Sequence, residues 1–194
     1  MLRIIKLENT LLNLIHRKNL IKSRLYLLFA RDAFNFIGKK TTIELPIKIW
    51  SPLSIYIGNN VFIGQGSWLE TIAPEVSVTK LKIMDGVSIS GYITITAAKS
   101  VTIEENVLIA KNVHISDHSH DFSDTQVPIK HQGITTPKPV SIGEGSWIGQ
   151  GAIICPGTKI GKNCVIGGNS VVKGDIPDYT LAAGSPAKVI RSLK

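Results

Sequence analysis

The chain has 194 residues, of which 43% are hydrophobic and 19% charged, and its formal net charge is +8 at pH 7. This composition excludes a disordered chain. No apolar run is long enough to span a membrane, because Lys22, Arg24, Arg31 and Asp32 interrupt the most apolar part of the N-terminus. That segment lacks a small-residue cleavage site, and Cys155 and Cys164 form neither a disulfide framework nor a CxxC motif. We therefore expect no signal peptide and a cytoplasmic protein.

The positive charge is concentrated at the N-terminus. Residues 1–40 hold nine Lys/Arg against two Asp/Glu, which is +7 of the total, so the rest of the chain is almost neutral. A basic end can lie against anionic lipid, although the plainer interpretation is a solvated helical face. We expect at most a weak association with the inner membrane surface, and no nucleic-acid partner.

The N-terminal segment has helix-like spacing of its apolar residues. It predicts two short helices that cap the rest of the chain or pack on a neighbouring subunit. We assign residues 1–50 to this helical cap segment and residues 51–194 to the main domain with its C-terminal tail. The apolar positions on the predicted helix face are Leu7, Leu11, Leu14, Ile15, Ile21, Leu25, Leu28 and Phe29.

From residue 55 onward an aliphatic residue recurs every six positions, and a second small or β-branched residue stands two positions before it. Because residues two apart on a strand share a face, each hexad predicts a short strand with two inward side chains and a tight corner. Three hexads make one triangular coil, and the coils stack as a parallel β-helix. A β-sandwich would not keep this register over the last six repeats, Ile142, Ile148, Ile154, Ile160, Ile166 and Val172.

The repeat is interrupted at residues 73–80 and again between His118 and Pro139. The second interruption predicts a long loop excursion at 118–139, and a long irregular loop on a rigid solenoid is usually functional or disordered. After Asp175 the repeats end, and Gly184 and Pro186 lie in a segment that we expect to close the stack.

Three histidines lie together at the start of that loop: His114, His118 and His120. His114 stands between two inward aliphatics, so it points outward. A catalytic zinc site usually needs three protein ligands, and no histidine between residues 17 and 113 could supply one from a neighbouring coil. We therefore predict no metal. A general base is the better use, since imidazole accepts a proton near neutral pH.

The stretch VTIEENVLIAKNVHISDHSH resembles the segment that leads into the catalytic histidine of galactoside, maltose and streptogramin acetyltransferases. These belong to the hexapeptide-repeat acyltransferases, whose fold is a left-handed β-helix and which include polysaccharide O-acetyltransferases. The resemblance covers about residues 55–192. It implies the left hand of the helix, a homotrimer, and His120 as the catalytic base, because an alignment without gaps places His120 on that histidine. His118 is the second choice, with Asp117 as an orienting carboxylate in the acceptor site.

Two further blocks of the resemblance imply binding residues. Trp147, in SIGEGSWIGQGAIICPGTKIG, matches a tryptophan beside the acceptor; an outward Trp can stack on a sugar or be buried at a trimer contact. Ser90 stands where sugar acetyltransferases carry an acceptor-binding Asn. The positions that match the acetyl-coenzyme A site of the family are Gly149, Gln150, Gly168, Lys173, Lys188 and Arg191, although the last two also fit a solvated basic tail.

The resemblance thus implies an acetyl-CoA-dependent O-acetyltransferase that acts on a hydroxyl of a sugar or glycan, as in surface polysaccharide modification. N-acetylation of a nucleotide-linked amino sugar is the nearest alternative. A non-catalytic β-helix scaffold is the second alternative.

Overall fold

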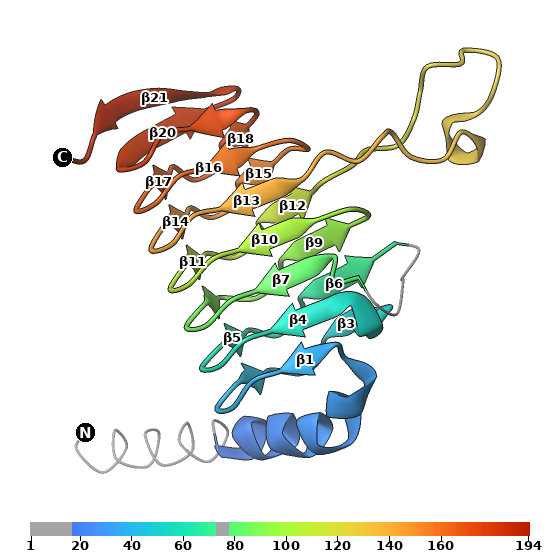
Figure 1. The fold of residues 1–194 in the computed structure, drawn as a ribbon, viewed down its shortest axis with the longest axis vertical. Helices are drawn as coiled ribbons and strands as arrows, with labels where there is room; N and C mark the ends of the chain where they lie inside the picture. The colour runs from blue at the N-terminus through green and yellow to red at the C-terminus, as the bar shows by residue number, and fades with distance from the viewer. Residues whose placement is uncertain (1–16, 73–77) are drawn as a thin grey trace, which may run out of the picture.

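The computed structural model describes residues 17–72 and 78–194, which form a solenoid of three mostly parallel sheets. From β1 to β20, consecutive strands belong to different sheets, so each coil passes through the three sheets, here called A, B and C, and then continues one rung further along the axis (Figure 1). The coils wind left-handed. The predicted left-handed parallel β-helix is confirmed.

The strands are short, as the hexads predict. Sheet A contains β1 (Phe36–Ile37), β4 (Ile55–Ile57), β7 (Leu81–Ile83), β10 (Val101–Ile103), β13 (Val140–Ile142), β16 (Lys159–Ile160) and β19 (Asp175–Ile176). Sheet B contains β2 (Thr42–Ile43), β5 (Phe62–Ile63), β8 (Ser88–Ile89), β11 (Leu108–Ile109), β14 (Trp147–Ile148), β17 (Val165–Ile166), β20 (Thr180–Gly184) and β21 (Ala187–Ser192). Sheet C contains β3 (Lys48–Trp50), β6 (Trp68–Thr71), β9 (Thr94–Ala97), β12 (His114–Ser116), β15 (Ile153–Ile154) and β18 (Val171–Val172).

The core is a set of aliphatic columns inside the solenoid. In sheet A, for example, Ile83, Ile103, Ile142 and Ile160 are in register on successive rungs, and all four are buried. Burying one such side chain stabilises the fold by about 1.5–3 kcal/mol relative to leaving it in water. The outward residues between the columns can therefore vary in type, and the surface chemistry of the protein lies there.

The corners between strands require a left-handed backbone, which Gly and Asn adopt at least cost. Five asparagines occupy such corners with φ between 48° and 59°. They are Asn60, Asn106, Asn112, Asn163 and Asn169.

The solenoid begins earlier than we predicted. A helix covers residues 17–30, η1 (Arg31–Ala33) follows, and β1, β2 and β3 already form the first coil, so the cap segment predicted for residues 1–50 is too long. Ile37, Ile43 and Ile49 do follow the six-residue repeat. However, η2 (Pro52–Ser54) lies between Ile49 and Ile57 and makes them eight residues apart, so the repeat cannot be traced back from Ile57 to the first coil. The helical prediction for residues 1–16 lies outside the described residues. Within them, no helix is both long and apolar enough to cross a membrane.

The predicted loop excursion is confirmed. The chain leaves sheet C after Ser116 and returns to sheet A at Val140, and the segment between them, which contains η3 (Ile129–His131), projects far from the solenoid (Figure 1). At the C-terminal end, β21 folds back antiparallel on β20 and covers the last rung of sheet B. This hairpin closes the stack, as expected.

Candidate active site

Two corners of the coils carry most of the predicted site residues. The B–C corner connects sheet B to sheet C and contains Ser90 in one coil and residues 149–151 in another. The C–A corner connects sheet C to sheet A and contains residues 98–100 in one coil and Asp117, the first residue of the loop excursion, in the next. In a triangular solenoid the C–A corner lies opposite sheet B.

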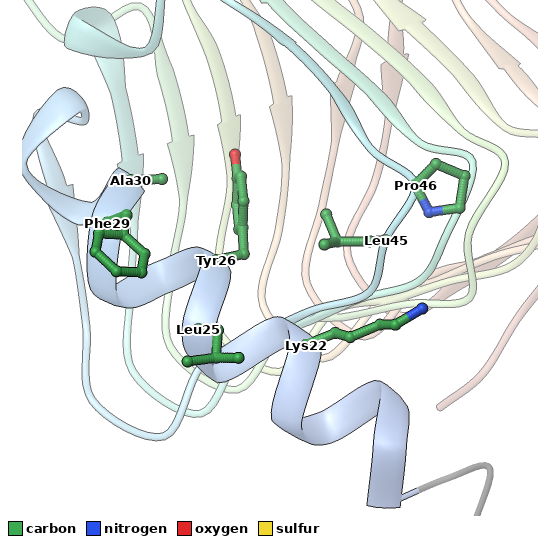
Figure 2. Close-up of a pocket in the computed structure, with 7 residues that line it drawn as sticks. All are labelled: Lys22, Leu25, Tyr26, Phe29, Ala30, Leu45 and Pro46. Atoms are coloured by element: carbon green, nitrogen blue, oxygen red, sulfur yellow. The ribbon is translucent and has the colours of Figure 1, made fainter.

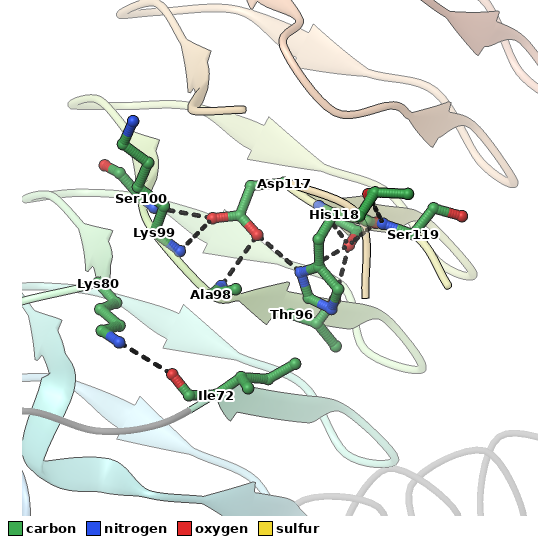
Figure 3. Close-up of polar contacts among 11 residues, drawn as sticks. Ile72, Lys80, Thr96, Ala98, Lys99, Ser100, Asp117, His118 and Ser119 are labelled. Carbon is green, nitrogen blue, oxygen red and sulfur yellow. Dashed lines mark hydrogen bonds and ion pairs between the residues drawn. The ribbon is translucent and has the colours of Figure 1, made fainter. Parts of the chain in front are cut away.

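Asp117 and His118 form a close pair at the C–A corner (Figure 3). The Nδ1 atom of His118 lies 2.7 Å from Oδ1 of Asp117, and Asp117 is completely buried. The His118 side chain remains 10% exposed. The pair is therefore a buried carboxylate that holds a mostly buried histidine whose side chain keeps a small exposed area.

The corner of the preceding coil stabilises the charge of Asp117. The backbone N–H of Ala98 donates to Oδ1 at 2.9 Å, and those of Lys99 and Ser100 donate to Oδ2 at 2.7 and 2.8 Å. Burial alone would raise the pKa of this carboxyl, but the hydrogen bonds from His118 and from the three backbone groups outweigh it and leave the pKa below its ordinary value. Asp117 is therefore ionised at neutral pH.

An ionised carboxylate can only accept hydrogen bonds, so the neutral His118 ring carries its proton on Nδ1. The lone pair of Nε2 then faces away from Asp117 and is available to accept a proton. Asp117 does not contact an acceptor directly, in contrast to our assignment of it to the acceptor site, because its side chain is buried and both its oxygens are already hydrogen-bonded.

Ser116 and Thr96 also position His118, and neither was predicted from the sequence. The Ser116 hydroxyl donates to the carbonyl of His118 at 2.7 Å and accepts from the Thr96 hydroxyl at 2.9 Å. Thr96 is the partner of Ser116 on the neighbouring rung. Matching each residue with the one a coil away, 20 positions earlier at this rung, would have found Thr96.

The other two histidines lie in different surroundings. His120 is exposed on the loop, where it forms an isolated antiparallel bridge with Ile134, and no carboxylate of the described residues bonds to it. His114 points outward from β12, as predicted, and its pKa is lowered by partial burial and then by the nearby His118. The geometry therefore reverses our order of preference and favours His118 over His120.

Trp147 and Ser90 do not meet the Asp117–His118 pair within one chain. Trp147 is on the outer face of sheet B, in register with Leu108, and both side chains are about half exposed. Ser90 is exposed at the B–C corner. Since the C–A corner lies opposite sheet B, a site that uses all of these residues needs more than one copy of the chain.

Three of the predicted coenzyme A residues come together at the B–C corner. Gly149 and Gly168 lie on adjacent rungs, and the carbonyl of Gln150 accepts from the N–H of Asn169 at 2.8 Å. A Cβ on Gly149 would lie 2.6 Å from the backbone of Gly168 and Ile166, so packing alone explains this glycine. A Cβ on Gly168 would meet the backbone of Gln150, with the carbonyl oxygen at 3.1 Å and the nitrogen at 3.9 Å.

The three predicted cations are exposed but are not grouped with those glycines. Lys173 follows β18 at a C–A corner, next to Cys155, whose thiol has a pKa raised by burial and only partly lowered by this lysine. Lys188 and Arg191 lie on β21, the edge strand of sheet B. The Nη1 atom of Arg191 donates to the backbone carbonyl of Ser192 at 3.2 Å, and both side chains are exposed at the C-terminal end of the solenoid.

Known proteins with hexapeptide repeats match this chain in sequence. Residues 139–174 match the family model for bacterial transferase hexapeptide, six repeats. A probable acetyltransferase of Mycobacterium tuberculosis is 36% identical over 76 residues, which cover 39% of this chain and 25% of that protein. The chain thus spans about a quarter of the length of this relative.

Solved structures match most of the chain. A hexapeptide-repeat-containing acetyltransferase from Vibrio cholerae has a TM-score of 0.62 at 27% identity, over 89% of this chain and 81% of that one. A variant of AntD, an N-acyltransferase from Bacillus cereus in complex with dTDP and coenzyme A, has a TM-score of 0.72 at 22% identity, over 86% and 88%. The chain is therefore a hexapeptide-repeat protein with the left-handed β-helix fold of the hexapeptide-repeat acetyltransferases.

Proposed function

We propose that the protein is an acetyltransferase that moves the acetyl group of acetyl-coenzyme A to a hydroxyl of a sugar or glycan. The observation that carries this proposal is the Asp117–His118 pair, a histidine oriented by a buried carboxylate at an open corner of this fold. Such a pair supplies the general base that a hydroxyl acceptor requires.

The reaction needs one proton acceptor and one good leaving group. The Nε2 atom of His118 takes the hydroxyl proton while the acceptor oxygen attacks the thioester carbonyl carbon. The carbon–sulfur bond then breaks, and the imidazolium returns the proton to the coenzyme A sulfur. Asp117 stabilises the imidazolium through Nδ1, because its charge lies 2.7 Å away. We assign the base to His118 for this reason, and His120 serves as the comparison residue.

The acetyl-coenzyme A site that we propose lies toward the C-terminal coils. Gly168 leaves space at the B–C corner for the pantetheine arm, and Gln150 presents its side chain at the same corner. Lys188 and Arg191 offer exposed cations for the nucleotide phosphates. Coenzyme A or acetyl-coenzyme A is bound in solved relatives of this fold, such as the acetyltransferase domain of PglB from Neisseria gonorrhoeae.

The active unit that we propose is a homotrimer. In one chain, Trp147 and Ser90 lie on surfaces away from His118, and Lys173 lies at a different corner from Gly149. A neighbouring copy that brings sheet B or the B–C corner of one chain to the C–A corner of another would complete the site. The half-exposed Trp147 and Leu108 suit either that contact or stacking on a sugar ring.

N-acetylation of a nucleotide-linked amino sugar is the second candidate. AntD has been solved in complex with dTDP-4-amino-4,6-dideoxyglucose and coenzyme A, so this fold accommodates such an acceptor. The same histidine could accept a proton from an amine, which means that the pair alone does not distinguish the two reactions.

Product analysis separates these reactions. The purified protein would be incubated with acetyl-coenzyme A and a panel of sugars, oligosaccharides and nucleotide amino sugars, and acetylated products would be identified by mass spectrometry before and after mild alkali. We expect a product whose acetyl group is lost in alkali, as an ester is. An alkali-stable product would establish N-acetylation, whereas coenzyme A binding without any product would favour the scaffold.

A further inference from the structure

The helix over residues 17–30 has two opposite apolar faces, and only one is covered by described residues. The inner face packs on the first coil: Leu27 is buried, and the buried Ser23 hydroxyl accepts from the N–H of Ile43 at 2.9 Å. On the outer face, Ile21, Leu25, Leu28 and Phe29 are 57%, 53%, 72% and 83% exposed. Four adjacent large apolar side chains in water indicate an interaction surface.

The outer residues form one continuous stripe. At about 100° per residue, positions 21, 25, 28 and 29 fall within roughly a third of the helix circumference, directly opposite Ser23 and Leu27. The helix lies across the N-terminal end of the solenoid (Figure 1), so the stripe faces away from the coils. Among the described residues, the N-terminal end of the solenoid therefore presents an exposed apolar stripe.

Basic residues border this stripe. Arg17 and Arg24 fall on one side of it and Lys22 on the other, while Lys18 lies in line with the stripe at its N-terminal end. Residues 17–30 contain four Lys/Arg and no Asp/Glu. Beside Leu28, a hollow of about 330 Å³ is lined by the cations of Arg24, Arg31 and Lys40, with Asp32 as its carboxylate. The apolar stripe is thus flanked by cations that suit anionic phosphate groups.

A second hollow extends the apolar surface toward the first coil (Figure 2). Its volume is about 730 Å³, and Leu25, Tyr26, Phe29, Leu45 and Pro46 line it together with Lys22 and Ala30. Lys22 is the one cation in this lining. An acyl chain could lie in this hollow while the ammonium group of Lys22 remains near the headgroups.

We propose that the helix over residues 17–30 docks the protein on an anionic lipid bilayer. An interfacial helix has an apolar face that enters the boundary between headgroups and acyl chains and a rim of Lys and Arg that meets anionic lipid, which is the arrangement here. A contact between two copies of this helix is the less favourable occupant, because it would place four cations of one copy against four of the other.

Vesicle flotation with the full chain tests the proposal. The vesicles would be phosphatidylcholine alone or phosphatidylcholine mixed with phosphatidylglycerol, at low and high salt. The variants would be the double mutants Leu28→Ser/Phe29→Ser and Lys22→Gln/Arg24→Gln. Phe122→Ser and Lys82→Gln are the controls, since they remove an exposed apolar and an exposed basic residue that lie outside the helix. Circular dichroism and light scattering would monitor folding and assembly of each variant.

We expect binding to the anionic vesicles only, and weaker binding at high salt. Leu28→Ser/Phe29→Ser should abolish flotation, and each removed cation should weaken it by about fivefold, while both controls bind normally. Absence of flotation by the unaltered protein, or equal flotation of all variants, would overturn the proposal. Loss of subunit assembly in Leu28→Ser/Phe29→Ser would also overturn it and assign the stripe to a second copy.

Discussion

The His118 ring nitrogen Nδ1 lies 2.7 Å from Oδ1 of Asp117, the residue before it in the chain, and Asp117 in turn accepts three backbone N–H groups from the previous coil. The solenoid thereby fixes both the charge of the carboxylate and the tautomer of the histidine. A reactive side chain on a long loop is held by the rigid stack beneath it.

Removing the charge of Asp117 should reduce catalysis more than acceptor binding. In Asp117→Asn the amide cannot hold the imidazolium, and we expect kcat to fall by about 10²-fold with little change in KM for the acceptor. Steady-state kinetics of the thiol released from acetyl-coenzyme A would measure this. Asp124→Asn, which changes an exposed loop carboxylate, should leave both constants unchanged, and equal losses in the two variants would contradict the role of Asp117.

The lowered pKa of Asp117 also predicts acid sensitivity of the fold. A carboxyl whose pKa is lower in the folded chain than the ordinary 3.8 contributes stability that is present above 3.8 and is lost as the pH falls through the folded value. The free energy of unfolding should therefore decline in this acidic range and decline less steeply in Asp117→Asn. Urea unfolding at a series of pH values would show this, and parallel pH profiles would refute it.

Alanine substitutions at Gly149 and Gly168 should distinguish a role in packing from a role in coenzyme A binding. In Gly149→Ala the new Cβ would overlap the next rung, so we expect a loss of about 1–3 kcal/mol in unfolding free energy. In Gly168→Ala the only close atom is the Gln150 carbonyl, so stability should change by less than about 1 kcal/mol while KM for acetyl-coenzyme A rises. An unchanged KM in Gly168→Ala would remove this residue from the proposed donor site.

Lys188 and Arg191 should act on the nucleotide end of the donor. Lys188→Ala and Arg191→Ala are each expected to raise KM for acetyl-coenzyme A severalfold, because a charge-assisted contact to phosphate is lost. With S-acetyl pantetheine as the donor, which lacks the nucleotide, neither variant should differ from the unaltered protein. Equal effects on both donors would instead indicate a structural role for the β21 strand.

Much of the fold follows from the sequence because hexad spacing directly reports which side chains face inward. The same rule places His114 outward and Ile103 in the core, and both are found there. The rule fails at the first coil, since the three residues of η2 shift the register before Ile57. The six-residue repeat therefore locates the regular coils, but it misses a coil that adjoins an insertion, as the first coil adjoins η2.

The candidate site was less accessible to sequence reasoning. Linear similarity pointed to His120, whereas the contacts that distinguish His118 are made by its neighbours Asp117 and Ser116. These two side chains are in turn hydrogen-bonded by residues 98–100 and Thr96, one coil away in space and about twenty residues away in sequence. Most of those donors are backbone N–H groups, so the residue types at these positions do not reveal the hydrogen bonds. The contacts between copies that we propose for the trimer likewise cannot be read from the residue spacing of a single sequence.

The most direct test of the proposed function measures acetyl-coenzyme A thiol release with an acceptor panel for the unaltered protein, His118→Ala and His120→Ala. We predict acceptor-dependent release that falls by about 10² to 10⁴ in His118→Ala and by much less in His120→Ala. Normal release in His118→Ala, or loss confined to His120→Ala, would contradict the assignment of His118 as the base.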